Sequence, residues 1–203
     1  MGRCPSRRLR ELMSYAPFIL VSFCAAFGYT LESPQQRANG LVVEWKAAIP
    51  RIPAALGAAY RLCSPDSRVV EIMQTADITG DNVAEALVEY CRPGAYTSSV
   101  ALVRLEKGKP LVARFRDGKG KVIEPAFFVG ASVRNGEDTR LIPARHAIYT
   151  LHSHTDDLGR LDRCTVQAYV WTPDHATFDL SQSLSKDVAA AECARLRKQL
   201  PTQ

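Results

Sequence analysis

The feature that most constrains the fold is a succession of short segments rich in β-branched residues, which begins after Cys63-Ser64-Pro65-Asp66. Clusters of Gly, Asn, Asp and Pro separate these segments, and this pattern is typical of strands joined by turns. Over 165–172 the residues alternate between the two faces expected of a strand. The predicted strands are Val69–Thr75, Ala84–Cys91, Ser98–Glu106, Pro110–Phe115, Phe127–Arg134, Leu141–Leu151, Thr165–Thr172 and Thr177–Leu180.

Several connections between the predicted strands are short enough for hairpins. Glu106-Lys107-Gly108-Lys109, Asn135-Gly136 and Pro173-Asp174 each suit a tight reversal. Strands that are neighbours in the sequence would then pair as neighbours in the sheet. We therefore predict a mainly β fold, either an antiparallel meander sheet or a small sandwich.

A short helix is predicted before the first strand. Leu41–Ile49 suits one or two helical turns, which Pro50 and Pro53 interrupt. Pro53 then suits the first turn of an Ala-rich helix that ends near Tyr60.

A second helix is predicted over 183–200, with Ser183 or Ser185 as its N-cap and Pro201 at its end. Helical spacing places one stripe of its side chains toward the sheet. This stripe contains Ala189, Cys193, Leu196 and Leu200.

Residues 1–28 have the pattern of an export signal, because several arginines precede an apolar run from Ala16 to Phe27 that is too short to span a bilayer as a helix. The alternative is an uncleaved membrane anchor. Cleavage after Gly28 would leave a flexible segment over 29–40 and a single β-rich domain over 41–203. We therefore expect an exported protein, periplasmic or secreted, without stable membrane insertion after cleavage.

Removal of the leader also changes the charge of the chain. The full chain has a formal net charge of +5, and loss of four of its 26 Lys and Arg residues and one of its 21 Asp and Glu residues leaves 22 − 20 = +2. No block of Lys and Arg interleaved with aromatic residues remains after cleavage. Nucleic acid is therefore not an expected partner.

The predicted mature chain keeps an even number of cysteines, namely Cys63, Cys91, Cys164 and Cys193. In an oxidising compartment such a set predicts two disulfides, and three pairings are open. We favour Cys63–Cys91 and Cys164–Cys193, because each pair flanks neighbouring elements. A zinc site is the alternative, but no Cys-x-x-Cys or Cys-x-x-His spacing supports it.

The segment Asp77-Ile78-Thr79-Gly80-Asp81-Asn82-Val83-Ala84-Glu85 places oxygen-bearing side chains at alternate positions and runs directly into a predicted strand. Calcium takes several oxygen ligands in flexible geometry, and this is the kind of loop that supplies them. The predicted Ca²⁺ ligands are Asp77, Thr79, Asp81, the Val83 carbonyl and Glu85.

This segment resembles the Asp-x-Asp-x-Asp-Gly-x-x-Asp loop of integrin-type FG-GAP or VCBS-like repeats in exported bacterial proteins. Tyr169-Val170-Trp171 followed by Phe178 is similar to the strand-turn-strand that closes such a propeller blade. The resemblance implies Ca²⁺ binding, a propeller-blade-like sheet and a role in adhesion or in carrying other domains.

The sequence also departs from that repeat pattern. Thr79, Asn82 and Glu85 stand where the repeat has a carboxylate or amide, a Gly and an Asp, and no second copy of the loop is present. A single sheet is therefore predicted in place of a closed propeller. In the alternative without metal, Asp77 and Asp81 make Asx-type turns and Glu85 lies in solvent.

The string His152-Ser153-His154-Thr155-Asp156-Asp157 resembles the His-x-His-x-Asp-His signature of metallo-β-lactamase-type hydrolases, which hold zinc. Asp157 replaces the final His of that signature, and His175 is the only later histidine. The simpler interpretation places His152 and His154 on one face at the end of a strand. A metal-dependent hydrolase using His152, His154 and Asp156 is the alternative function.

No other pattern indicates catalysis or a cofactor besides Ca²⁺. We therefore expect a non-catalytic binding or structural β-domain, stabilised by disulfides, with a protein or a cell-envelope glycan as its partner. The aromatic residues Tyr169, Trp171 and Phe178 are predicted to pack in the core or on the sheet face.

Overall fold

The computed structural model describes residues 45–94, 96–132 and 134–199. The predicted export signal over 1–28 and the predicted flexible segment over 29–40 lie outside the described residues.

Pro50, Pro53 and Gly57 divide the N-terminal helical region into short pieces. Residues 45–48 are helical, and a 3-10 turn (Ile49–Arg51) and the helices α3 (Ile52–Leu56) and α4 (Ala58–Leu62) follow. A second 3-10 turn, Pro65–Ser67, leads into the first strand. The short predicted helix is therefore confirmed within the described residues.

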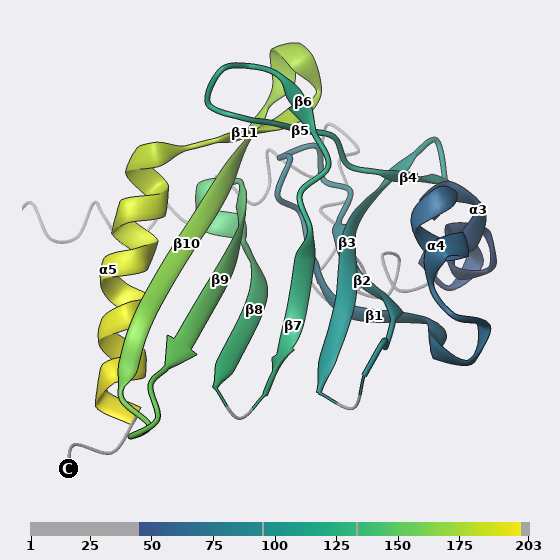
Figure 1. The fold of residues 1–203 in the computed structure, drawn as a ribbon. Coiled ribbons are helices and arrows are strands. Elements are labelled where there is room, and N and C mark those ends of the chain that lie inside the picture. The colour runs from purple at the N-terminus through teal and green to yellow at the C-terminus, as the bar shows by residue number, and fades with distance from the viewer. Residues whose placement is uncertain (1–44, 95, 133, 200–203) are drawn as a thin grey trace, which may run out of the picture. The chain divides into compact units, whose positions relative to one another are not determined.

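The remainder of the domain is a sheet and one long helix (Figure 1). The helix α5 spans Gln182–Gln199. The strands are β1 (Arg68–Ala76), β2 (Glu85–Cys91), β3 (Thr97–Glu106), β4 (Lys109–Val112), β5 (Phe115–Arg116), β6 (Val122–Ile123), β7 (Phe127–Ala131), β8 (Asn135–Ile142), β9 (Ala147–Thr155), β10 (Leu161–Thr172) and β11 (Thr177–Leu180).

The strands form one sheet in the order β1-β2-β3-β7-β8-β9-β10-β11-β5-β6, and β4 pairs with β3. The pairing is antiparallel except between β11 and β5, which is parallel. The predicted antiparallel, mainly β fold is therefore confirmed. It is not a pure meander, because β5 and β6 leave the sequence order and join the sheet beyond β11.

The structure corrects one predicted strand and one predicted hairpin turn. The predicted strand Leu141–Leu151 is two strands, because a 3-10 turn at Pro143–Arg145 separates β8 from β9. Asn135 begins β8 instead of forming its turn, and the Ser132 hydroxyl accepts a hydrogen bond from the Asn135 N–H at 3.1 Å. A polar side chain thus closes the reversal before the Asn-Gly pair.

The two faces of the sheet are buried by different elements. Side chains from residues 45–56 cover one face of β2 and β3, in a cluster of Trp45, Ala48, Ile52, Leu56, Ala86, Val88, Ala101, Val103 and Leu105. The other face holds the central core of Ile78, Leu87, Val100, Leu102, Ala113, Phe115, Phe127, Leu141, Ile148, Tyr169 and Phe178. Fully burying one such aliphatic or aromatic side chain contributes about 1.5–3 kcal/mol.

The helix α5 packs along β10 (Figure 1) and covers Tyr149, Leu151 and Ala168 through Leu184. The N-cap prediction was off by a few residues, because the Ser181 hydroxyl accepts the Leu184 N–H at 3.3 Å. Ser185 instead lies inside the helix.

The Ser185 hydroxyl lies between the helix α5 and the strand β10. Ser185 Oγ donates to the Ser181 carbonyl at 2.6 Å and accepts from the Ala168 N–H at 2.9 Å. This hydroxyl therefore satisfies a buried backbone group of β10.

The strand β1 also contacts β8, although the two are far apart in the sheet order. The Gln74 Oε1 accepts a hydrogen bond from the Leu141 N–H at 3.1 Å. On that side of β8 the ladder to β7 contains only the pairs that involve Gly136 and Glu137. The Gln74 side chain thus satisfies a strand amide that β7 does not reach.

Within the described residues, we find no helix that is both long enough and apolar enough to cross a membrane.

Candidate functional site

The predicted calcium loop connects β1 to β2. Asp77 accepts two backbone hydrogen bonds, from Gly80 N–H to Oδ1 at 2.6 Å and from Asn82 N–H to Oδ2 at 2.9 Å. Asp81 Oδ1 accepts the Val83 N–H at 2.9 Å. Gly80 and Asn82 have φ values of 80° and 66°, which suit these two residue types. Asp77 and Asp81 therefore make the Asx-type turns of the metal-free alternative.

Glu85 departs from that alternative, which placed it in solvent. Only 1% of this residue is exposed. Its carboxylate accepts hydrogen bonds from the Ile78 N–H at 2.9 Å and from the Thr79 hydroxyl at 3.1 Å. Burial raises the pKa of the Glu85 carboxyl above its ordinary value, and these hydrogen bonds oppose the rise. Through these two hydrogen bonds, the buried Glu85 side chain fixes the loop to the start of β2.

The oxygens of the loop therefore serve its own backbone first. Within the described residues, no group of three or more His, Cys, Asp or Glu side chains is arranged to hold a metal ion. Ca²⁺ binding by Asp77, Thr79, Asp81, Val83 and Glu85 stays a prediction.

The two histidines of the predicted cluster lie on the same face of β9, as the simpler interpretation expects. His152 Nδ1 lies 3.5 Å from Glu137 Oε1, which belongs to the directly opposite residue of β8. His154 Nδ1 lies 2.9 Å from Asn135 Oδ1, also directly opposite. Each histidine therefore has a neighbour on β8.

Asp156 does not join the two histidines. Its Oδ1 accepts the backbone N–H groups of Leu158 and Arg160, and its Oδ2 pairs with the Arg160 guanidinium at 2.8 Å. The hydrogen bonds from Arg160 and Leu158 lower the pKa of this carboxyl. Asp156 therefore organises the turn between β9 and β10.

Arg104 on β3 is a residue that the sequence reasoning did not select. Its guanidinium carbon lies 4.2 Å from the centre of the Trp171 ring, and its Nε lies 3.7 Å from Glu85 Oε1. The side chain is 25% exposed. Arg104 occupies a position that alternation assigns to the same face as the core residues Val100 and Leu102. A charged residue in that register is the signal that would have identified it.

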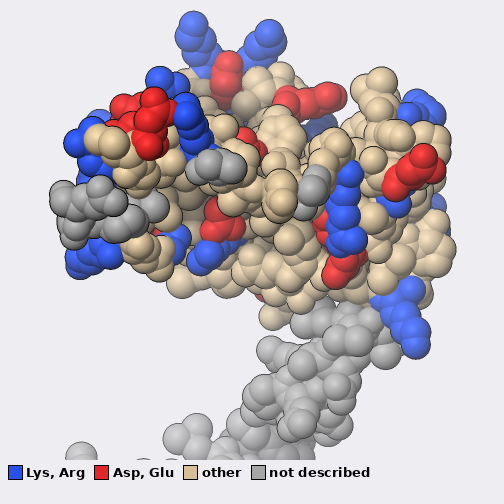
Figure 2. Space-filling view, turned by 60° about the horizontal axis from the view of Figure 1, so that its bottom comes forward, with Lys and Arg blue, Asp and Glu red and all other residues tan. Residues whose placement is uncertain are grey.

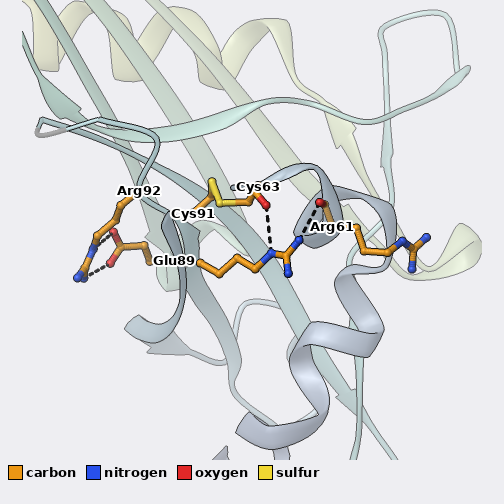
Figure 3. The surroundings of a disulfide bond; sticks show 6 residues. Arg61, Cys63, Glu89, Cys91 and Arg92 are labelled. Atoms are coloured by element: carbon orange, nitrogen blue, oxygen red, sulfur yellow. Dashed lines mark hydrogen bonds and ion pairs between the residues drawn. A yellow bond between two sulfur atoms is a disulfide. The ribbon is translucent and has the colours of Figure 1, made fainter. Parts of the chain in front are cut away.

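Both disulfides have the predicted pairing. Cys63–Cys91 joins the segment after α4 to the end of β2 (Figure 3), and Cys164–Cys193 joins β10 to α5. Beside the first disulfide, Arg92 pairs with Glu89 at 2.6 Å. Arg68 donates to the Cys63 carbonyl at 3.0 Å. Each disulfide therefore connects a helical segment to the sheet.

The charged side chains of the described surface are interspersed. Figure 2 shows Lys and Arg next to Asp and Glu over the end of the molecule that it presents. Ion pairs such as Arg134–Asp157 and Arg195–Glu192 are part of this pattern. The face drawn in Figure 2 does not present one continuous charge of a single sign.

Tyr169 and Phe178 lie in the central core, and Trp171 packs against that core. Tyr169 and Phe178 each contact the Phe115 ring, with centroids 5.2 Å and 5.5 Å away. The Trp171 ring lies 5.1 Å from the Phe178 ring. The prediction that these three residues pack in the core or on the sheet face is therefore confirmed.

Comparison of the chain with protein-family models, with curated proteins and with solved structures finds no match to any of the three.

Proposed function

We propose that this chain is an exported binding or structural β-domain, whose partner is a protein or a cell-envelope glycan. The observation that carries the proposal is the pairing of Cys63 with Cys91 and of Cys164 with Cys193. Disulfides form and persist in oxidising compartments and are rare in the cytosol. The leader pattern over 1–28 supports the same location.

The resemblance of the β1–β2 loop to FG-GAP or VCBS-like repeats supports binding as the role. Such repeats act in adhesion or carry other domains.

The location is tested by expressing the full chain in a bacterium that has a periplasm. The cytosolic, periplasmic and secreted fractions are alkylated without reduction. The disulfides and the N-terminus of the protein in each fraction are then determined by mass spectrometry. We expect both disulfides and a new N-terminus near residue 29 in the periplasmic or secreted fraction. An uncleaved chain with free thiols that remains in the cytosol would overturn the proposed export.

The binding role is tested by capture from the envelope fraction with the disulfide-bonded protein as bait, with and without a chelator. A protein or glycan that is retained specifically and competed by soluble bait supports the proposal. Retention of the same material by a reduced, unfolded bait would show that it does not depend on the fold.

Calcium binding at the loop is tested by thermal unfolding of the purified protein in millimolar Ca²⁺ and in chelator. A ligand that binds only the folded state raises the Tm. In the Asp81→Asn variant the side-chain oxygen still accepts the Val83 N–H and one charge is removed, so a calcium-dependent rise should disappear in it. An unchanged Tm of the unmutated protein would end the calcium hypothesis.

A further inference from the structure

Arg104 is held in place without using its hydrogen-bond donors. Its guanidinium stacks on Trp171 and lies near Glu85 at a distance too long for a hydrogen bond. It donates no hydrogen bond to any described residue, and of its nitrogens only Nε is both buried and unpartnered there. The terminal nitrogens therefore belong to the exposed quarter of the side chain.

A series of contacts begins and ends at this guanidinium, which stacks on Trp171. The backbone N–H of Trp171 donates to the backbone carbonyl of His146 at 2.8 Å. The His146 ring lies against Gly80, where an added Cβ would be 3.3 Å from its Cε1. Gly80 follows Thr79, whose hydroxyl donates to Glu85 at 3.1 Å. Glu85 leads back to Arg104 at 3.7 Å.

These contacts bring together four parts of the chain that are distant in sequence. They are the β1–β2 loop, the strand β3, the turn before β9 and the end of β10. The loop is fixed by carboxylate hydrogen bonds, and the turn at His146 has a left-handed backbone with φ 49°. The surroundings of Arg104 are therefore preorganised before any ligand arrives.

Planar stacking fixes the orientation of a guanidinium, and its paired N–H groups match the two oxygens of a carboxylate. Glu85 is close enough to offset part of the positive charge of Arg104. Asp81 adds negative potential to this region, since it also acts on the Glu85 carboxyl. Glu85 and Asp81 would repel a dianion such as phosphate more strongly than a carboxylate, which carries a single negative charge.

We propose that Arg104 is the anion-binding residue of a ligand site at the rim of the sheet, and that the ligand carries a carboxylate. This inference rests on the proposed binding function. The carboxylate comes from the C-terminus of a peptide or from an acidic sugar. Trp171, which is only partly buried, supplies an apolar surface beside it.

The test uses the whole disulfide-bonded protein and matched probes in isothermal titration calorimetry at low salt. N-acetyl-alanyl-alanine is compared with its C-terminal amide, and glucuronic acid is compared with glucose. We expect at least one free acid to bind at least tenfold more tightly than its neutral partner. The pair that shows the difference identifies the source of the carboxylate.

Two substitutions at Arg104 and one control assign that difference to the residue. Arg104→Met should abolish binding of the acid, and Arg104→Lys should weaken it, because an ammonium lacks the planar fork. Arg163→Met removes the same charge from an exposed position on β10 and should leave binding unchanged.

Equal binding of acid and neutral probes, or no binding of either acid at about 10 mM, would overturn the proposal. So would unchanged affinity in a folded Arg104→Met variant. The probe comparison uses the unmutated protein, so it decides the question even where a variant fails to fold. Specific capture of an envelope partner despite a negative probe result would retain the proposed function and reject this site.

Discussion

The Glu85 carboxylate accepts a hydrogen bond from the backbone N–H of Ile78 at 2.9 Å, so the first residue of β2 holds the second residue of the loop that precedes it. Ile78 is fully buried in the central core. This bond therefore connects the polar loop to the packing of the sheet. It also places an ionisable group in the interior.

We expect Glu85→Gln to change how stability depends on pH. Burial raises the folded-state pKa above the ordinary 4.5, so the folded protein binds this proton more tightly than the unfolded chain does. The stability that this proton contributes to the folded state is fully present below pH 4.5, and it is lost as the pH rises through the folded-state pKa of Glu85. Urea unfolding at a series of pH values should show a flatter profile for the variant above pH 4.5. A profile parallel to that of the unmutated protein would contradict the assignment.

Removing the carboxylate altogether should cost more than neutralising it. Glu85→Ala leaves the Ile78 N–H and the Thr79 hydroxyl without their acceptor and Arg104 without its nearby anion. Leaving buried polar groups unsatisfied costs about 1–3 kcal/mol for each group. We expect a loss of about 3 kcal/mol in the free energy of unfolding, measured in urea. The exposed Glu106→Ala is the matched control and should change it by less than about 0.5 kcal/mol.

Glu89 should show the opposite pH dependence. The hydrogen bond from Arg92 lowers its pKa, so its contribution is present above the ordinary 4.5 and is lost as the pH falls through the lower folded-state value. Glu89→Gln should therefore remove part of the acid sensitivity of the Tm. Glu71 pairs with the same guanidinium but is exposed, and Glu71→Gln should have the smaller effect. Equal effects of the two variants would show that burial of Glu89 is irrelevant.

A Gly130→Ala substitution tests whether the close approach of the Gly130 backbone to Tyr96 requires glycine. The φ of Gly130 is 143°, and a Cβ there would lie 1.9 Å from the Tyr96 carbonyl oxygen. Because that atom belongs to the backbone, strands β3 and β7 would have to separate. We expect Gly130→Ala to lower the free energy of unfolding by roughly 3 kcal/mol or more. Gly94→Ala meets nothing within 4 Å and should be nearly neutral.

Local sequence signals predicted the parts of the fold that local interactions determine. The strand Thr177–Leu180 was predicted with its observed bounds, because Pro173-Asp174 ends the preceding strand. The reversal before Asn135 was misplaced, because the Ser132 side chain supplies the hydrogen bond that closes it. The pairing of β5 with β11 joins segments that are distant in sequence, so no local sequence pattern predicts it.

The same distinction applies to the candidate sites. The Asx-type turns of Asp77 and Asp81 were a stated alternative, since they involve neighbouring backbone groups. The burial of Glu85 and the stacking of Arg104 on Trp171 depend on how β2, β3 and β10 come together. Periodicity places Arg104 on the core face, but only the tertiary structure shows what lies beneath it.

Ala176 occupies a position where glycine should be favoured. Its φ and ψ are 49° and 45°, the left-handed conformation that costs a residue with a Cβ about 1–2 kcal/mol. Glycine avoids that strain but loses more conformational entropy on folding. We expect Ala176→Gly to raise the free energy of unfolding by roughly 0.5 kcal/mol. Ala190→Gly, inside α5, should lower it by about 1 kcal/mol, and a loss of similar size at Ala176 would contradict the strain argument.

The Cys164–Cys193 disulfide should decide how firmly α5 is held on β10. The cysteines are 29 residues apart, and closing a loop of that size in the unfolded chain contributes roughly 3–4 kcal/mol in the chain-entropy model. Replacing both cysteines by Ala should therefore lower the free energy of unfolding by about that amount. The Ala168 N–H, which donates to Ser185 Oγ, should then exchange with deuterium faster than the amides of β2. In the double variant that removes Cys63 and Cys91, the Ala168 N–H should exchange more slowly than the amides of β2. The Ser185 contact and the Leu184 packing remain intact in that variant. Equal acceleration in both double variants would mean that the domain opens as a whole and that α5 has no separate dependence on its disulfide.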